Sequence, residues 1–236
     1  MRELHHGNVE GATQEKHVDV RNQEGEEAIA EERQGRSTES RGTEGAAYRA
    51  QLAVLIPLSG GEPMNIFVLD ENPIRAAEMM CDKHIPKMIV ESAQMMASAV
   101  RRWGATDEEM PIAKTSGKPY KGGYAHHPCT RWAGDTFGNF SWLADHAMAL
   151  CVEYTSRFGK KHACDDPISQ LWRVGIEYRG EPLWEDDDDY KRTPFAQAMP
   201  IEYRDDDAVR AYRAYYHSKH FAKWEKGTPA PHWWNG

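Results

Sequence analysis

The sequence predicts a mainly α-helical protein: a small single-domain helical bundle with a short N-terminal extended segment, preceded by a disordered N-terminal tail. Three observations lead to this prediction. All eight Trp and all four Cys of the 236-residue chain lie after residue 63. Residues 1–63 are mostly polar and rich in Glu, and their first part lacks the apolar spacing of a helix or strand. From Met64 onward, the sequence contains several segments that each have a helix-capping residue and apolar side chains at helical spacing. These segments are not repeats of one another.

We therefore divide the chain at Met64. Residues 1–63 are expected to be a disordered tail or an extension added by a wrongly assigned upstream start, and the sequence leaves both open. Residues 64–236 are expected to form one helical catalytic or binding domain, because this length is sufficient to bury a core. The tail carries a net charge of −5 and the domain −3, out of −8 for the whole chain. A nearly neutral domain argues weakly against a strong nucleic-acid binder but leaves room for local basic patches.

Two classes of protein are disfavoured by composition. No run of about 18 apolar residues is present, so no membrane-spanning segment is expected. The four cysteines lack Cys-x-x-Cys spacing and the density of a disulfide-stabilised small domain. We expect them to be reduced thiols, and we expect the protein to be cytoplasmic.

The domain is expected to open with an extended segment and a long helix. Residues 65–69 form one short apolar strand or extended segment. Asn72 and Pro73 are a helix start, with Asn as the cap and Pro at the first helical position. Apolar side chains at helical spacing carry this helix toward Trp103. Pro86 lies in its middle and is expected to kink or divide it.

Two further helices follow a loop. Residues 104–124 are rich in Gly, Lys and Pro and read as a loop. A second helix is expected to start near His127 and Pro128. A third helix is expected to be capped by Asn139 and ended by Gly159, since Asn favours a cap and Gly favours a helix end.

The C-terminal region combines acidic, aromatic and basic residues. Residues 184–200 are expected to be irregular and acidic. The last helix opens at residues 205–207, where three carboxylates favour the positive end of the helix dipole, and is expected to run to about Lys226. Trp233 and Trp234 follow. Aromatic residues among basic ones suit base stacking and backbone contact, so we assign this pair to nucleic-acid binding. The alternative is that the aromatic residues of the helix form a buried core stripe, an assignment that fits the terminal Trp pair less well.

One polar cluster lies inside the first long helix. In helical geometry His84, Lys87 and Glu91 share a face, and Lys83 lies beside them. His can act as a general acid or base near neutral pH, and Lys and Glu can tune it. We therefore assign Lys83, His84, Lys87 and Glu91 as candidate catalytic residues. The alternative is a structural histidine with solvated lysines on the outer face.

A second cluster spans residues 124–132. It places two adjacent histidines, a cysteine, a hydroxyl and an arginine at a loop-to-helix junction. Helix-terminal amides together with Arg131 form a plausible phosphate or carboxylate site. We assign His127 and Arg131 to nucleic-acid binding. The alternative is an ordinary helix start with Pro128 in the first turn.

The histidines also raise the question of a metal. None has the paired spacing of a zinc finger or of the His-Glu-x-x-His motif, so we expect no metal ligands and no cofactor. The residues that could nevertheless supply ligands are His84, His126, His127, His146 and His162, with Cys129 and Asp82.

The order of these segments resembles the phage-type pyrimidine-dimer DNA glycosylases, the endonuclease V family. Lys83–Met88 is similar to the Arg-Glu-Leu-Pro-Arg-Val segment in that family's first long helix, and Met199–Arg204 is similar to its Ile-Pro-Gln-Glu-Phe-Arg segment. The helix start at His127 and the helix end at Gly159 fall where that family has similar elements. The resemblance spans about residues 64–234.

The resemblance implies a function and a mechanism. Those enzymes are small, mainly helical repair proteins that excise a damaged pyrimidine and nick the abasic strand. They attack the sugar carbon with the N-terminal α-amine, and a Glu assists the Schiff-base steps. We therefore expect a DNA-processing enzyme of this glycosylase and lyase type, with DNA as its partner and, if it is phage-encoded, the host cytoplasm as its location. We also expect protein that starts at Met64 to nick ultraviolet-irradiated duplex.

Two departures from the family pattern stand beside this expectation. His84 stands where the family has its catalytic Glu. The proton transfers of the reaction would therefore need His84 itself or Glu91. A free amine at the start of the extended segment requires Met64 or Asn65 as the chain terminus, because any preceding residue turns that nitrogen into an amide. We expect a pocket lined by ionisable side chains where the first long helix meets the turn that carries His126 and His127, called here the double-histidine turn.

Two other functions remain open from sequence. The first is an enzyme that uses the histidine cluster, with or without a metal, on a nucleotide or modified base. The second is a non-catalytic phage protein that binds nucleic acid or protein.

Overall fold

The computed structural model describes residues 64–180 and 188–235. The expectations for residues 1–63 and for the acidic residues 184–187 lie outside this part. Within it, the mainly α-helical class is confirmed: six α-helices and two short 3₁₀ turns are present, and no strand is found among the described residues. The two turns are η2 (Asp188–Tyr190) and η3 (Ile201–Tyr203).

Two helices occupy the range from Pro73 to Trp103, so of the two outcomes expected there, a kinked helix or a divided one, the divided one is found. Helix α3 (Pro73–Glu78) is capped by Asn72 as expected, and helix α4 (His84–Trp103) begins after a break. The division lies at residues 79–83, however, and not at Pro86 as expected. Pro86 is the third residue of α4, in a first turn whose N–H groups have no partner within the helix, so the ring costs no helical hydrogen bond.

The next two helices agree with the sequence except at one cap. Helix α5 (Pro128–Ala133) starts after His127 as expected, and α6 (Phe137–Phe158) ends at Gly159, which has the left-handed φ of 67°. The cap of α6 is Thr136 rather than Asn139: the Thr136 hydroxyl accepts from the Asn139 N–H at 3.1 Å. Asn139 is drawn into the core, where its amide donates to the Trp132 carbonyl at 2.8 Å.

The last two helices differ more from the expectations. Helix α7 (Asp165–Arg179) was not predicted. Helix α8 (Ala208–His217) is capped by Asp207 as expected but ends well before Lys226. The following segment crosses back to the α3–α4 break, where the Asp82 N–H donates to the Lys223 carbonyl and the Glu225 N–H donates to the Asp82 carboxylate. Backbone groups used in this way are not available to extend a helix.

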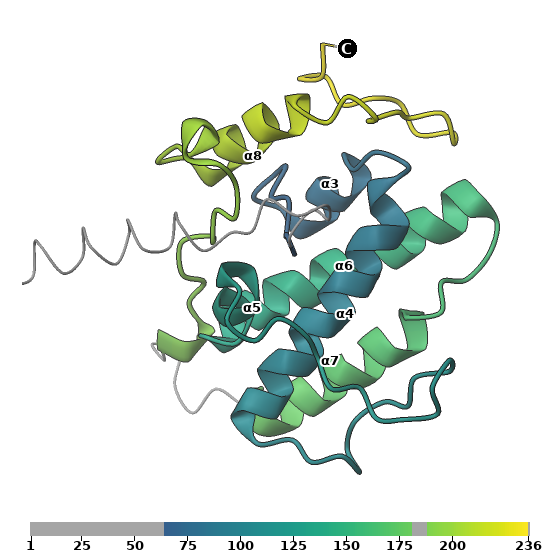
Figure 1. The fold of residues 1–236 in the computed structure, drawn as a ribbon, viewed down its shortest axis with the longest axis vertical. Coiled ribbons are helices and arrows are strands. Elements are labelled where there is room, and N and C mark those ends of the chain that lie inside the picture. The colour runs from purple at the N-terminus through teal and green to yellow at the C-terminus, as the bar shows by residue number, and fades with distance from the viewer. Residues whose placement is uncertain (1–63, 181–187, 236) are drawn as a thin grey trace, which may run out of the picture. The chain divides into compact units, whose positions relative to one another are not determined.

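The helices pack around α4, which contacts α5, α6 and α7, while α3 packs on α6 (Figure 1). Helices α6 and α7 pack closely at Gly175, where an added Cβ would lie 2.2 Å from the Phe140 ring. All four cysteines are free and buried in this core. None of the described helices is long and apolar enough to cross a membrane.

Candidate active site

The extended segment at residues 64–69, where the described part of the chain begins, is mostly buried and held in an unusual conformation. The Asn65 side-chain oxygen accepts from the N–H groups of Ile66 at 2.8 Å and Phe67 at 3.1 Å, and its amide donates to the Ala198 carbonyl at 2.9 Å. Phe67 has a φ of 36°, which non-glycine residues rarely adopt. Backbone strain of this kind costs of the order of 1–3 kcal/mol and clusters at functional sites.

A buried carboxylate from α4 contacts this segment. The backbone N–H of Asn65 donates to Glu91 Oε2 at 3.0 Å, and Lys87 Nζ lies 3.1 Å from Glu91 Oε1. Lys87 and Glu91 are one helical turn apart, which is why their side chains meet. Burial raises the pKa of the Glu91 carboxyl, and the opposing charge of Lys87 and the Asn65 hydrogen bond act against this rise. The Glu91 carboxyl group thus contacts two nitrogens, the backbone nitrogen of Asn65 and Nζ of Lys87.

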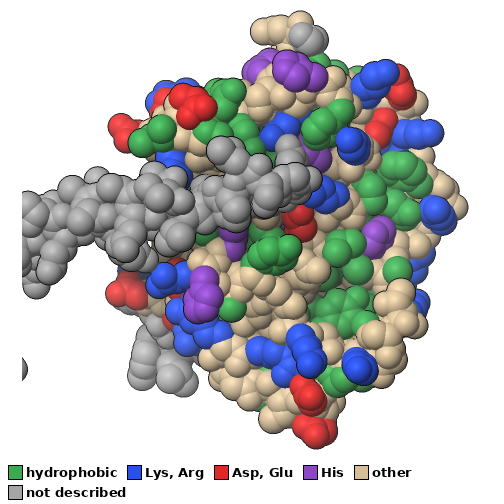
Figure 2. Space-filling view, in the orientation of Figure 1, with side chains coloured by type: hydrophobic (Ala, Val, Ile, Leu, Met, Phe, Trp, Pro, Cys, Tyr) green, Lys and Arg blue, Asp and Glu red, His purple; other side chains and the backbone are tan. Residues whose placement is uncertain are grey.

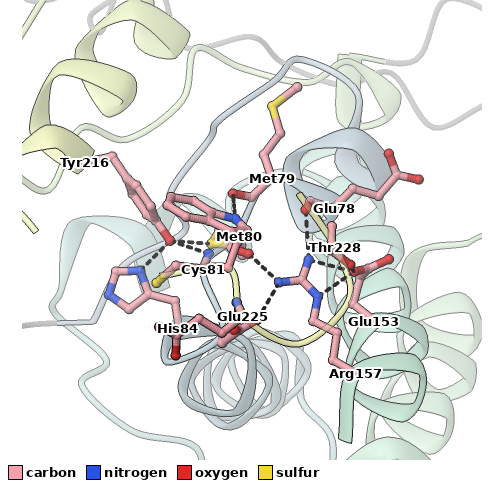
Figure 3. Close-up of polar contacts among 12 residues, drawn as sticks. Glu78, Met79, Met80, Cys81, His84, Glu153, Arg157, Tyr216, Glu225 and Thr228 are labelled. Carbon is pink, nitrogen blue, oxygen red and sulfur yellow. Dashed lines mark hydrogen bonds and ion pairs between the residues drawn. The ribbon is translucent and has the colours of Figure 1, made fainter. Parts of the chain in front are cut away.

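His84 lies at the start of α4 next to Phe67, Tyr216 and Phe221, and Figure 3 shows its ring beside Tyr216. Its ring stacks on Phe67 with centroids 4.7 Å apart, and its Nδ1 is 2.8 Å from the hydroxyl of Tyr216. That hydroxyl also accepts from the Cys81 N–H at 2.9 Å. The same hydroxyl donates to the Met80 sulfur at 3.8 Å, and whether Tyr216 or His84 donates in their hydrogen bond depends on the imidazole tautomer.

The Cys81 thiol belongs to the same cluster. Burial acts to raise its pKa, but hydrogen bonding to His84 and the charge of His84, followed by the Tyr216 hydrogen bond, bring the pKa below its usual value. Cys129, on α5, has the opposite character: burial raises the pKa of its thiol to about 12.

Helix α5 closes the other side of the extended segment. The Thr130 hydroxyl donates to the Met64 sulfur at 3.6 Å. The first long helix and the double-histidine turn are therefore joined through residues 64–67. His84 lies against Phe67, whereas His127 caps α5 by accepting from the Cys129 N–H at 3.3 Å.

The candidate catalytic residues divide into two groups. His84, Lys87 and Glu91 lie on one face of α4 against the extended segment. Lys83 points elsewhere: it is exposed, and its ammonium lies over the Phe221 ring, 4.1 Å from the centroid.

The candidate nucleic-acid residues occupy two separate places. On α5, Arg131 is exposed, and His127 is half-buried, with a pKa lowered by burial. Trp233 and Trp234 are half-buried against α8 and the α3–α4 break. The Trp233 indole N–H donates to the Met79 sulfur at 3.3 Å, and the Trp234 ring stacks on His217 with centroids 4.8 Å apart.

Three residues that shape the site were not among the predicted site residues: Asn65, Thr130 and Tyr216. Asn65 had a local signal, because a short polar side chain inside an apolar extended run is typical of a backbone turn. Tyr216 had none, since it is 132 residues from its partner His84. Within residues 64–180 and 188–235, no group of three or more His, Cys, Asp or Glu side chains has the proximity needed to hold a metal ion.

Comparison with known families gives one result. Residues 64–166 match the family model of the pyrimidine dimer DNA glycosylases. The resemblance expected from sequence is therefore confirmed over this segment, which contains His84, Lys87 and Glu91 together with helices α3 to α6. The match supports, at the level of the family, a function like that of a pyrimidine dimer DNA glycosylase. No curated protein and no solved structure matches the chain.

Proposed function

We propose that this protein is a DNA glycosylase and abasic-site lyase that removes damaged pyrimidines and nicks the strand at the resulting site. The observation that carries the proposal is the Glu91 carboxylate, buried in the family-matched segment and in contact with two nitrogens. Chemistry of this class needs an amine to attack the sugar carbon and a carboxylate beside it to move protons.

Glu91 suits the proton-transfer role. Burial raises the pKa of the Glu91 carboxyl above its usual value, and so brings this pKa closer to neutral pH. A group whose pKa is nearer to the working pH is a better general acid and base. His84 lies on the same face of α4, one helical turn before Lys87. In this proposal His84 supports the site, and Tyr216 and Phe67 hold its ring in place.

Several exposed or half-buried side chains are proposed to bind DNA. Arg131 and His127 on α5, with Lys83, would contact backbone phosphates, and Trp233 and Trp234 would lie near the nucleic acid. Figure 2 shows Lys and Arg side chains spread across one face of the described residues, with Asp and Glu mostly near its edges. Such a face suits a phosphate backbone although the net charge of the chain is negative.

The buried free cysteines fit a reducing compartment. We propose the cytoplasm as the location, and the host cytoplasm if the protein is phage-encoded.

A nicking assay with a Glu91 variant tests the function. Ultraviolet-irradiated duplex is incubated with the full chain, and cleavage is followed on a denaturing gel. Glu91→Gln keeps an acceptor for the Asn65 N–H but removes the charge and the proton acceptor. We expect this variant to reduce nicking by at least about a hundredfold, the usual range for loss of a general acid or base.

Glu177→Gln is the matched control, because Glu177 is an exposed carboxylate on α7. We expect it to nick like the unaltered protein. Absence of nicking by the unaltered chain, or full activity in Glu91→Gln, would contradict the proposed function.

A further inference from the structure

Tyr124 has two features that the function proposed above does not explain. Its side chain is 69% exposed, although burial of an aromatic ring is favourable. Its backbone has a φ of 51°, in the left-handed region that residues other than Gly, Asn and Asp rarely adopt. Strained residues of this kind cluster at active sites and at the places where ligands are held. The exposed ring is therefore a candidate for contact with a ligand.

The backbone on both sides of Tyr124 is fixed. The Gly123 N–H donates to Ser98 Oγ on α4 at 2.9 Å, and that hydroxyl donates to the Gly123 carbonyl at 3.2 Å. Gly122, with a φ of 78°, packs on the same serine so closely that an added Cβ would lie 2.8 Å from its backbone nitrogen. On the other side, the His127 N–H donates to the Tyr124 carbonyl at 2.8 Å. The neighbouring residues thus hold the strained conformation while the ring stays exposed.

This turn lies at the edge of the candidate site. The loop that leads into α5 crosses α4 (Figure 1), and a Cβ added to Gly123 would lie 3.8 Å from the side chains of Met64 and Gln94. Met64 is the first described residue of the extended segment, and Gln94 follows Glu91 by three residues on α4. Tyr124 is thus the next residue after one that lies close to both the extended segment and the helix with the carboxylate.

The charge around Tyr124 favours a polyanion. Residues 110–134 contain four Lys or Arg and no Asp or Glu, although the whole chain has a net charge of −8. All four basic side chains are exposed: Lys114, Lys118, Lys121 and Arg131. An exposed aromatic ring among basic side chains suits DNA with an unpaired or unstacked base, because the ring stacks on the base while the cations contact phosphates.

We propose that Tyr124 stacks on a base of damaged DNA, next to the nucleotide that is processed at Glu91. Enzymes that act on a base in a duplex extrude a nucleotide, and the stacking at that step is lost. A side chain inserted there replaces part of this stacking. Because the backbone of Tyr124 is already fixed, little conformational entropy is lost when the ring is inserted. This inference rests on the proposed function and adds to it a residue that contacts the bases.

Binding to a duplex with a tetrahydrofuran abasic-site analogue tests the inference. The analogue has no hydroxyl at C1′ and forms no imine, so fluorescence anisotropy with the full chain measures binding apart from chemistry. Tyr124→Asn removes the ring but keeps a residue that tolerates a left-handed φ. We expect its Kd to rise about fivefold to a hundredfold, the range for loss of one stack between a base and an aromatic ring.

Two variants serve as controls. Tyr124→Phe keeps the ring, and we expect it to bind the analogue duplex like the unaltered protein. Val152→Ala shortens an apolar side chain on α6 that is 68% exposed, and we expect it to leave the Kd unchanged. Urea unfolding checks that each variant folds, and Tyr124→Asn should unfold like the unaltered protein because the ring that it removes is exposed.

A crosslinking measurement on the unaltered chain decides the assignment even if Tyr124→Asn does not fold. 5-Iodouracil is placed beside the abasic-site analogue, and light joins this base to an aromatic side chain that stacks on it. The crosslinked peptide is located by mass spectrometry, and we expect it to contain Tyr124.

The outcomes separate this inference from the proposed function. A crosslink at another residue, or a folded Tyr124→Asn variant that binds as tightly as the unaltered protein, would overturn the role of Tyr124. So would an equal loss of affinity in Tyr124→Phe. Nicking of ultraviolet-irradiated duplex by the unaltered chain would leave the proposed function standing in each case. An unaltered chain that neither nicks irradiated duplex nor prefers the analogue duplex to an intact one would overturn both.

Discussion

The side chain of Asn65 shows how one residue positions the candidate site. Its oxygen accepts from two successive backbone N–H groups, and its amide is anchored on the Ala198 carbonyl. These bonds offset the cost of the positive φ at Phe67 and place that ring against His84. The same turn leaves the Asn65 N–H directed at Glu91. A residue without a side-chain oxygen at position 65 would leave two of these N–H groups without their partner.

His146 provides a pH-dependent test of the core at the residue scale. It is fully buried on α6 beside Trp142, and within the described part of the chain neither ring nitrogen has a hydrogen-bond partner. Burial lowers the pKa of its imidazole to about 3. The folded protein therefore binds this proton less readily than the unfolded chain, whose histidine has a pKa near 6.5.

The stability contributed by neutral His146 is complete above about pH 6.5 and falls as the pH is lowered toward 3. This histidine alone should make the free energy of unfolding about 2 kcal/mol lower at pH 5 than at pH 7. We expect His146→Leu to remove this part of the pH dependence in urea-unfolding measurements. His126→Gln, at an exposed histidine, is the control and should leave it unchanged. An unaltered pH dependence in His146→Leu would contradict the assignment of a neutral buried imidazole.

At the scale of elements, Arg157 joins α6 to the break between α3 and α4 (Figure 3). Its side chain is fully buried, and it donates to the carbonyls of Glu78 at 2.9 Å and Met80 at 2.8 Å. It also contacts the carboxylates of Asp82 at 3.2 Å and Glu153 at 2.7 Å. The segment that it holds leads directly into His84, so Arg157 stabilises the start of α4 from behind the site.

Arg157→Lys should lower the free energy of unfolding by about 3–5 kcal/mol, because a single ammonium cannot reach all four acceptors and buried groups lose their partners. Arg210→Lys is the control: Arg210 pairs with Asp205 at 2.7 Å on the surface, where water screens the two charges and the pair contributes little to stability. Urea unfolding of both variants measures the difference. Equal losses in the two variants would show that the buried network does not hold α6 to the α3–α4 break.

At the scale of the whole molecule, residues near the C-terminus complete a site whose carboxylate lies in the family-matched segment. Glu91 and Lys87 lie within residues 64–166, but Tyr216 and Phe221, which pack on His84, lie outside it. Figure 1 shows α8 beside α3 and the start of α4. The environment of His84 thus depends on contacts between distant parts of the chain.

Local signals predicted much of this fold. The starts of α3, α5 and α8 were each marked by a cap or a proline, and Gly159 marked the end of α6. Helix α7 also had such signals, since two Asp and a Pro open it and apolar residues follow at helical spacing, so it could have been predicted. The end of α8 could not, because the segment after it is held by the distant Asp82, which donates its N–H to the Lys223 carbonyl and accepts from the Glu225 N–H.

In the candidate site too, some contacts follow from local sequence signals and others do not. The shared face of His84, Lys87 and Glu91 follows from helical spacing and was predicted. Asn65 and Glu91 are 26 residues apart in the sequence, and His84 and Tyr216 are 132 residues apart. Because both contacts join distant parts of the chain, no local sequence pattern could predict them. Lys83 was grouped with the others by its neighbours in sequence, but its side chain lies over Phe221.

The most direct test of the central claim is the mass of the intact full chain after incubation with duplex DNA and borohydride. If the Glu91 site runs imine chemistry on damaged pyrimidines, ultraviolet-irradiated duplex will add the mass of a DNA strand or strand fragment to the protein, and unirradiated duplex of the same sequence will not. A protein mass that stays unchanged with irradiated duplex would contradict the account.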